Sequence, residues 1–327
     1  DWLKAKGTTL GADDGIGIAM EMALLKANDI EHGPIECVFT RDEETGLTGA
    51  FEMKPGFMTG DYLINLDSED EGQLFVSCAG GVRTEATYTV DEEKLPEGFS
   101  TFNLVVKGLT GGHSGDDINK KRANANKLLV RFLCEQSEKT DLRLCDIQAG
   151  GLHNAIPREA HATVAVPTAY VATFGEELQA FVEKVRDEFS ATEPELTAII
   201  EPVAAAPTCI CKEQAERLLK SLSVVHNGIF AMSQDLEGLV ETSSNLASVR
   251  KHGNQIVATT SQRSSVASNL EYMASVVRSA FELGGAKCVT NEGYPGWKMN
   301  PKSEILKVCV DSYKRLFGKD PLVRAIH

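Results

Sequence analysis

The chain has 327 residues, of which 42% are hydrophobic, enough for a large core and for two domains. Its 47 acidic and 33 basic residues give a formal net charge of -14 at pH 7, which argues against a nucleic-acid partner because phosphate binding needs a basic stripe. No apolar run reaches about 18 residues and no secretory signal opens the chain, so we expect no membrane span and a cytoplasmic location.

Residues 1–81 alternate helical and strand-like segments. Helix periodicity covers 16–26, and apolar strand patterns cover 35–40, 62–67 and 74–78. This alternation predicts an α/β domain with a mainly parallel sheet.

The pattern changes after Gly81. Segments 85–90, 102–109, 142–147 and 160–166 alternate like half-exposed strands, and 123–135, 176–189 and 212–225 have helical spacing. A similar set recurs at 239–249, 255–261, 270–283 and 286–290, without a sequence repeat. From residue 292 the α/β pattern resumes with helix 303–317 and a last strand. We therefore predict that residues 82–291 are an α+β domain inserted into a first domain made of 1–81 and 292–327.

The spacing of the cysteines predicts the state of their thiols. The eight cysteines are scattered, and the C-x-C of Cys209 and Cys211 is neither a zinc-ribbon nor a redox spacing, so we expect reduced structural thiols.

The first residue is Asp1 rather than Met, and His327 follows a strand-like segment. These features suggest that both ends are cut.

Carboxylates lie at one end of each of three predicted elements of the first domain. Glu43 and Glu44 come after strand 35–40, Asp67 ends strand 62–67, and Asp13 precedes helix 16–26. Most acidic pairs are solvated surface, and Asp13 with Asp14 can simply cap the helix. Three such ends in one region favour a dication site at the sheet edge, where one carboxylate binds metal while another moves a proton.

Six motifs in order resemble the aminoacyl-histidine dipeptidases (Xaa-His dipeptidases), PepD-type members of the M20 metallopeptidases, over essentially the whole chain. They are Leu10-Gly11-Ala12-Asp13-Asp14-Gly15, the Thr-x-x-Glu-Glu-x-Gly pattern at 40–46, Asp67-Ser68-Glu69, Gly111-Gly112-His113-Ser114-Gly115, 154–160 (NAIPREA) and Tyr294-Pro295-Gly296-Trp297.

The resemblance implies a zinc-peptidase-like catalytic domain with an inserted lid and two divalent metal ions, zinc foremost, with cobalt or manganese as alternatives. Asp13 would bridge the ions, Glu44 would bind one and Asp67 the other. Glu43 would be the general base and acid, because a carboxylate that does not bind metal must carry the proton from water to the leaving amine.

The lid supplies further candidates. The glycines around His113 allow close approach to another surface, and the resemblance implies that this histidine stabilises the tetrahedral oxyanion; a merely structural role is the alternative. Arg263 is a candidate to hold the substrate's C-terminal carboxylate in a two-pronged contact. Asn245 is a candidate for the same end, and Asn154 either contacts substrate or only organises its turn.

The sequence departs from the family in its metal ligands. It contains neither the upstream His-x-Asp motif nor the downstream metal-binding histidine, and we do not count His327 as that ligand. Two protein ligands per metal are fewer than the three of ordinary catalytic zinc sites. We expect a dipeptidase that forms a homodimer. Because of the missing ligands, the alternatives are a non-catalytic binding or dimerisation module and an aminoacylase or carboxypeptidase of the same family.

Overall fold

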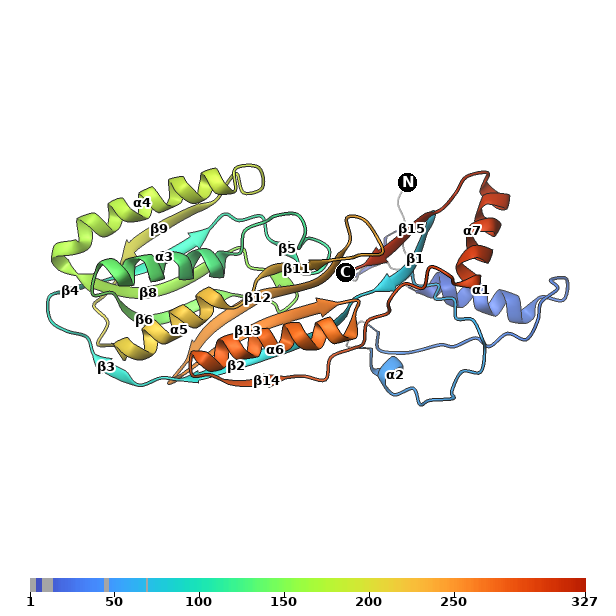
Figure 1. Cartoon of the computed structure of the whole chain (residues 1–327), viewed down its shortest axis with the longest axis horizontal. Helices are drawn as coiled ribbons and strands as arrows, with labels where there is room; N and C mark the ends of the chain where they lie inside the picture. The colour runs from blue at the N-terminus through green and yellow to red at the C-terminus, as the bar shows by residue number, and fades with distance from the viewer. Residues whose placement is uncertain (1–3, 8–13, 44–46, 69) are drawn as a thin grey trace. The chain divides into compact units, whose positions relative to one another are not determined.

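The computed structural model describes residues 4–7, 14–43, 47–68 and 70–327 (Figure 1). The chain forms two compact units, one of residues 1–73 with 303–322 and the other of residues 74–302 with 323–327. The second unit contains all of residues 82–291, whose boundaries as a functional domain stay a prediction.

Helices make up the regular structure of the first unit. They are α1 (Gly15–Lys26), α2 (Thr48–Phe51) and α7 (Glu304–Phe317). The two longer helices begin at side-chain caps, since Asp14 Oδ1 accepts the N–H of Gly17 at 2.9 Å and Ser303 Oγ accepts that of Leu306 at 3.4 Å. The capping prediction is thus confirmed for Asp14, whereas Asp13 lies outside the described residues.

The strands predicted at 35–40 and 62–67 are absent from the described structure, so these two predictions are wrong. Ile35, Phe39, Leu63 and Ile64 are exposed. A parallel strand forms only beside neighbours that bind its N–H and C=O groups, and the described part of the first unit provides none. The chain has the predicted mixed α/β class, but the strand pairs of its nine-stranded sheet are antiparallel rather than parallel.

A nine-stranded sheet forms most of the second unit. Its strands follow the order β14-β2-β13-β12-β6-β8-β4-β9, and β11 pairs with β12 beside that path. Their bounds are β2 (Gly80–Thr89), β4 (Phe99–Lys107), β6 (Arg143–Gly150), β8 (Ala160–Pro167), β9 (Thr197–Pro202), β11 (Gly228–Met232), β12 (Val240–His252), β13 (Gln255–Ser264) and β14 (Lys287–Thr290).

The sheet consists of two modules with the same topology. One runs β4, α3 (Ala125–Lys139), β6, β8, α4 (Val171–Glu188), β9; the other runs β2, α5 (Lys212–Val224), β12, β13, α6 (Ala267–Leu283), β14. In both, the four strands lie in the spatial order second, third, first, fourth, the split βαβ arrangement. The structural recurrence suggested by the sequence is confirmed, and the first module is inserted between β2 and α5 of the second.

The modules join edge to edge through β6 and β12, whose antiparallel register pairs Val249 with Ala149. The four helices pack onto the sheet in one hydrophobic core (Figure 1). Leu128, Leu129 and Phe132 of α3, which lies in the predicted helical segment 123–135, are buried. Pairing these two edges leaves neither open for another chain.

Three two-stranded sheets complete the unit, and one of them carries a predicted site residue. They are β1 (Gln73–Cys78) with β15 (Leu322–Ile326), β3 (Glu92–Lys94) with β10 (Thr208–Ile210), and β5 (Gly112–His113) with β7 (Ala155–Ile156). A 3-10 turn, η1 (Thr168–Tyr170), leads into α4. All eight cysteines are free thiols. Among the described residues, no helix has both the length and the apolar composition that crossing a membrane requires.

The end of α5 is closed by a lysine from α3. Lys127 Nζ donates to the carbonyls of Leu222, Ser223 and Val225 at 2.9, 2.6 and 2.9 Å. Burial lowers the pKa of Lys127 to about 8, which leaves the ammonium mostly charged at pH 7. Its three N–H groups therefore satisfy carbonyls that have no partner within the helix, at the negative end of the helix dipole.

We expect Lys127→Met to lower the free energy of unfolding by about 2 kcal/mol, because it leaves these carbonyls without their charged donor. Denaturant unfolding measures the change. Lys220→Met, at an exposed position of α5, is the control and should change stability by less than about 0.5 kcal/mol. Equal stability of the two variants would contradict the capping role.

Candidate functional site

The predicted acidic site is only partly described. Asp13 and Glu44 lie outside the described residues, whereas Glu43 and Asp67 are exposed. The carbonyl of Glu43 accepts the N–H of Leu47 at 3.1 Å, and the N–H of Asp67 donates to Asn65 Oδ1 at 2.9 Å. Within the described ranges, no three His, Cys, Asp or Glu side chains converge as a metal site would require. The fit of Asp13, Glu44 and Asp67 to a metal ion therefore stays a prediction.

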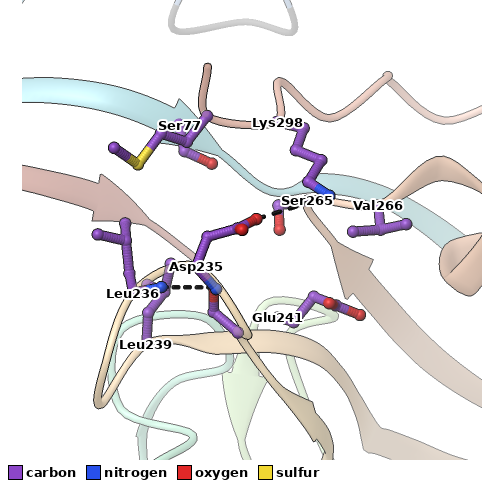
Figure 2. Close-up of a pocket in the computed structure, with 10 residues that line it drawn as sticks. Ser77, Asp235, Leu236, Leu239, Glu241, Ser265, Val266 and Lys298 are labelled. Carbon is purple, nitrogen blue, oxygen red and sulfur yellow. Dashed lines mark hydrogen bonds and ion pairs between the residues drawn. The ribbon is translucent and has the colours of Figure 1, made fainter. Parts of the chain in front are cut away.

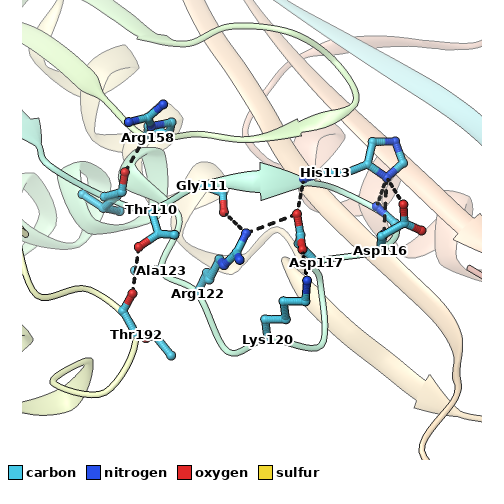
Figure 3. Close-up of polar contacts among 12 residues, drawn as sticks. Thr110, Gly111, His113, Asp116, Asp117, Lys120, Arg122, Ala123, Arg158 and Thr192 are labelled. Carbon is cyan, nitrogen blue, oxygen red and sulfur yellow. Dashed lines mark hydrogen bonds and ion pairs between the residues drawn. The ribbon is translucent and has the colours of Figure 1, made fainter. Parts of the chain in front are cut away.

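His113 lies on a glycine-rich loop that polar contacts hold in place (Figure 3). Its backbone N–H donates to Asp117 Oδ2 at 2.8 Å. Arg122 Nη1 binds the same carboxylate at 3.2 Å and the carbonyl of Gly111 at 2.5 Å. A Cβ on Gly112 would lie 2.2 Å from Arg122 Nη1 and 2.3 Å from Asp117 Oδ2, so only glycine fits there. The loop therefore requires glycine at position 112, because the Asp117–Arg122 ion pair occupies the space that a side chain there would need.

The hydrogen bonds of the His113 ring favour one tautomer. The backbone N–H groups of Gly115 and Asp116 both lie 3.3 Å from Nδ1 and donate to it. A ring nitrogen that accepts carries no proton, so these two bonds favour the neutral tautomer with its proton on Nε2, whereas Asp116 Oδ2, 3.5 Å from Nδ1, favours a proton on Nδ1. In the tautomer that the two N–H groups favour, His113 presents a hydrogen-bond donor at Nε2, from a side chain that is 38% exposed.

Asp117 is a stable anion beneath this loop. The hydrogen bond from Lys120 lowers the pKa of Asp117 most, the N–H of His113 and the charge of Arg122 lower it further, and burial opposes them. Asp117 thus stays ionised at neutral pH and keeps both its backbone and its guanidinium partners. Asp117 and Arg122 were not predicted as site residues from the sequence, although an acidic residue four positions after His113 was a readable signal.

Asn154 belongs to the turn opposite His113, and Asn245 contacts that turn from β12. The carbonyl of Asn154 accepts the N–H of Ser114 at 2.8 Å. Asn245 is buried on β12, where its Nδ2 donates to the carbonyl of Ala155 at 2.8 Å and its Oδ1 accepts from Asn124 Nδ2 at 3.2 Å. Both asparagines therefore hold the turn, and a direct contact of either with substrate stays a prediction.

Arg263 lies near the end of β13, opposite Ser243 of β12 and Gly81 of β2. Its Nε is buried and has no hydrogen-bond partner among the described residues. Burial, then the charges of Arg83 and Arg263, lower the pKa of His153. A buried guanidinium N–H without a partner is costly, and a carboxylate oxygen is the group that would satisfy it.

The second unit therefore brings together four of the predicted residues, His113, Asn154, Asn245 and Arg263. The backbone of Ser114 and the side chain of Asn245 link the first three, and an ideal Cβ on Gly115 would lie 3.1 Å from Arg263 Nη1. A neutral donor and a cation thus lie on one side of the unit. Such a pair can bind the two polar ends of a small anionic substrate.

A small pocket lies at the start of β12 and contains none of the predicted site residues (Figure 2). There Lys298 Nζ lies 3.5 Å from Asp235 Oδ2, and Ser233 Oγ accepts the N–H groups of Asp235 and Leu236. It is lined by Ser77, Ser233, Asp235, Leu236, Leu239, Glu241, Ser265, Val266, Lys298 and Met299. These charged groups are already paired.

Comparisons with known proteins identify several relatives. The family model "Peptidase dimerisation domain" matches residues 97–196. The "Cytosol non-specific dipeptidase" of Escherichia coli (strain K12) is 39% identical over 327 residues, which are 100% of this chain and 67% of that protein. The crystal structure of the aminoacylhistidine dipeptidase from Vibrio alginolyticus superposes with a TM-score of 0.94 and 40% identity, over 100% of this chain and 66% of that one. The chain thus spans about two thirds of the length of both relatives.

We expect Gly112→Ala to lower the free energy of unfolding by about 2 kcal/mol, because the methyl group would overlap Arg122 and Asp117 and the residue has a φ of +141°. Denaturant unfolding measures this, and NMR of the His113 ring reports whether its tautomer changes. Gly151→Ala is the matched control, since a Cβ there meets nothing within 4 Å. If both variants unfold alike, the proposed packing of the loop is wrong.

Proposed function

The chain belongs to the aminoacyl-histidine dipeptidases of the M20 peptidase family, and from this premise we propose that the protein of which it is part hydrolyses dipeptides. The observation that carries the proposal is the similarity to two named dipeptidases along all 327 residues. We propose dipeptides with a C-terminal histidine as preferred substrates, with others accepted. The name of the Vibrio relative supports the preference for histidine. The name of the Escherichia coli relative supports the acceptance of other dipeptides and a cytosolic location.

Glu43 is the residue that moves the proton. It is an exposed carboxylate next to the predicted metal ligand Glu44 in the sequence. In the proposed reaction it takes a proton from the attacking water and gives it to the amine of the leaving histidine. Both transfers are needed because water is a poor nucleophile and an amide anion a poor leaving group at neutral pH.

His113 stabilises the oxyanion that forms when water adds to the peptide carbonyl. The supporting observation is that Nδ1 accepts two backbone N–H groups, which favours the tautomer with its proton on Nε2. A neutral N–H donor held in advance by the protein needs no rearrangement when charge develops on the carbonyl oxygen.

Arg263 binds the C-terminal carboxylate of the dipeptide. Its partnerless Nε supports this role, and a guanidinium can bind both oxygens of a carboxylate in one plane. Asn154 and Asn245 support the same end of the substrate from the turn that they hold.

Asp13, Glu44 and Asp67 would hold two divalent metal ions, for which we propose zinc, with cobalt and manganese as alternatives. Such ions polarise a peptide carbonyl and lower the pKa of bound water. Carboxylates suit these dications as ligands. Family membership is the support for this assignment, since only Asp67 of the three is a described residue.

A homodimer is the proposed assembly, and the match of residues 97–196 to a peptidase dimerisation domain supports it. A dimerisation or binding module without catalysis, and an aminoacylase or carboxypeptidase activity, remain the competing functions. Measured turnover of dipeptides, acylated amino acids and longer peptides separates them.

We expect Glu43→Gln in the full-length protein to lower the rate of glycyl-histidine hydrolysis at least about a hundredfold, because the amide cannot accept the proton of water. Metal content should stay unchanged. Glu52→Gln, another exposed position, is the control and should keep wild-type turnover. Retained activity in Glu43→Gln would exclude it as the base.

We expect Asp13→Ala to remove bound metal from the full-length protein, because a bridging ligand serves both ions. Elemental analysis after dialysis gives the stoichiometry directly, independently of turnover. Asp14→Ala is the control, since Asp14 caps α1 and its loss should cost stability but not metal. An unchanged stoichiometry in Asp13→Ala would exclude the bridging role.

A further inference from the structure

His327 is a buried histidine to which the proposed reaction gives no role. Its relative exposure is 7%, and its Nε2 lies 2.6 Å from Ser243 Oγ on β12. Its Nδ1 is buried without a hydrogen-bond partner among the described residues. Enclosing a polar ring in this way costs free energy, so the position calls for an explanation beyond packing.

The strand register links His327 to Arg263. Ser243, the partner of His327, lies directly opposite Arg263 in the antiparallel pair of β12 and β13. Side chains at opposite positions of such a pair point to the same face of the sheet. The ring of His327 is therefore fixed to the neighbour of Arg263 on the same face.

The backbone of His327 approaches Arg263 through Gly115. An ideal Cβ on Gly115 would lie 2.2 Å from the carbonyl oxygen of His327 and 3.1 Å from Arg263 Nη1. The glycine, His327 and the guanidinium are thus in close contact, with no room for a further methyl group. These neighbours limit the orientations that the guanidinium can take.

The ring of His327 beside Arg263 is uncharged at neutral pH. Burial and, after it, the charge of Arg263 lower the pKa of His327 to about 4, while the carbonyl of Val240 acts in the opposite direction. A neutral ring neither repels the guanidinium nor neutralises it. The charge of Arg263 remains available to a ligand, and its partnerless Nε–H is a donor for one.

We propose that His327 is a positioning residue that, anchored by Ser243, holds Arg263 in the orientation that receives the substrate's C-terminal carboxylate. The inference rests on the proposed function only in taking that carboxylate as the ligand. His327 itself does not contact the substrate.

Calorimetric binding of histidine and of histidinamide to the full-length protein tests this, because the two probes differ in the carboxylate and neither is cleaved. His327→Phe keeps an aromatic ring but loses the bond to Ser243. We expect it to weaken histidine binding about tenfold, a change of about 1.4 kcal/mol, and to leave histidinamide binding within about twofold. His327→Gln can bond Ser243 again and should bind histidine like the wild type. His252→Phe, at an exposed position of β12, is the control and should also bind like the wild type.

The link to Arg263 is tested by a double-mutant cycle. In an Arg263→Met background, His327→Phe should have no further effect on histidine binding. An equal loss for both probes, a full additional effect in the Arg263→Met background, or wild-type histidine binding by His327→Phe would each overturn the proposal. Wild-type protein that does not prefer histidine to histidinamide would overturn it too.

Hydrolysis of glycyl-histidine, measured on the same wild-type protein, separates the two proposals. Turnover without discrimination between the probes overturns the role of His327 and keeps the dipeptidase. Discrimination that depends on His327, without turnover, overturns the dipeptidase and keeps the role of His327. Thermal unfolding of each variant shows that it is folded, and His327→Gln covers the case in which His327→Phe is not.

Discussion

The antiparallel register of β12 is the constraint on which the candidate site of the second unit depends. β12 pairs with β13 on one side and with β6 and β11 on the other. These ladders place Ser243 opposite Arg263 and fix Asn245 two residues further along the same strand. A slip of one residue would turn every side chain of β12 to the other face. It would separate Arg263 from Ser243 and His327, and Asn245 from the turn opposite His113.

The same strand is unusual in being polar and buried. From Val240 to Val249 every residue of β12 is buried, although the stretch includes Glu241, Thr242, Ser243, Ser244 and Asn245. Their side chains find specific partners: Asn269 for Glu241, Ser264 for Thr242, His327 for Ser243, Gln262 for Ser244 and Ala155 for Asn245. Buried polar groups must be paired, so this strand specifies the positions of the segments that pack on it more narrowly than an apolar strand would.

The polar residues of the candidate site are of two kinds, those that support the loop and those that keep a donor for a ligand. Asp117 and Arg122 are charged and paired, and they hold the backbone around His113. His113 and Arg263 lie next to these supports and keep donors for a ligand, Nε2–H by the choice of tautomer and Nε–H by the lack of a partner. The groups that hold the loop thus have their hydrogen bonds satisfied within the protein, and those proposed to bind substrate do not.

The sequence by itself determined the four helices and most of the strands of the second unit, though not β9 and β11, together with the cap at Asp14 and the family, because helical and strand periodicities and short motifs are local properties. It also predicted strands at 35–40 and 62–67 that the described structure lacks, since a strand exists only with neighbours and periodicity does not supply them. Only the tertiary structure decided that two modules join through β6 and β12, that two backbone N–H groups meet Nδ1 of His113, and that His327 lies beside Arg263. Each of these depends on contacts between residues far apart in the chain, which register and packing create.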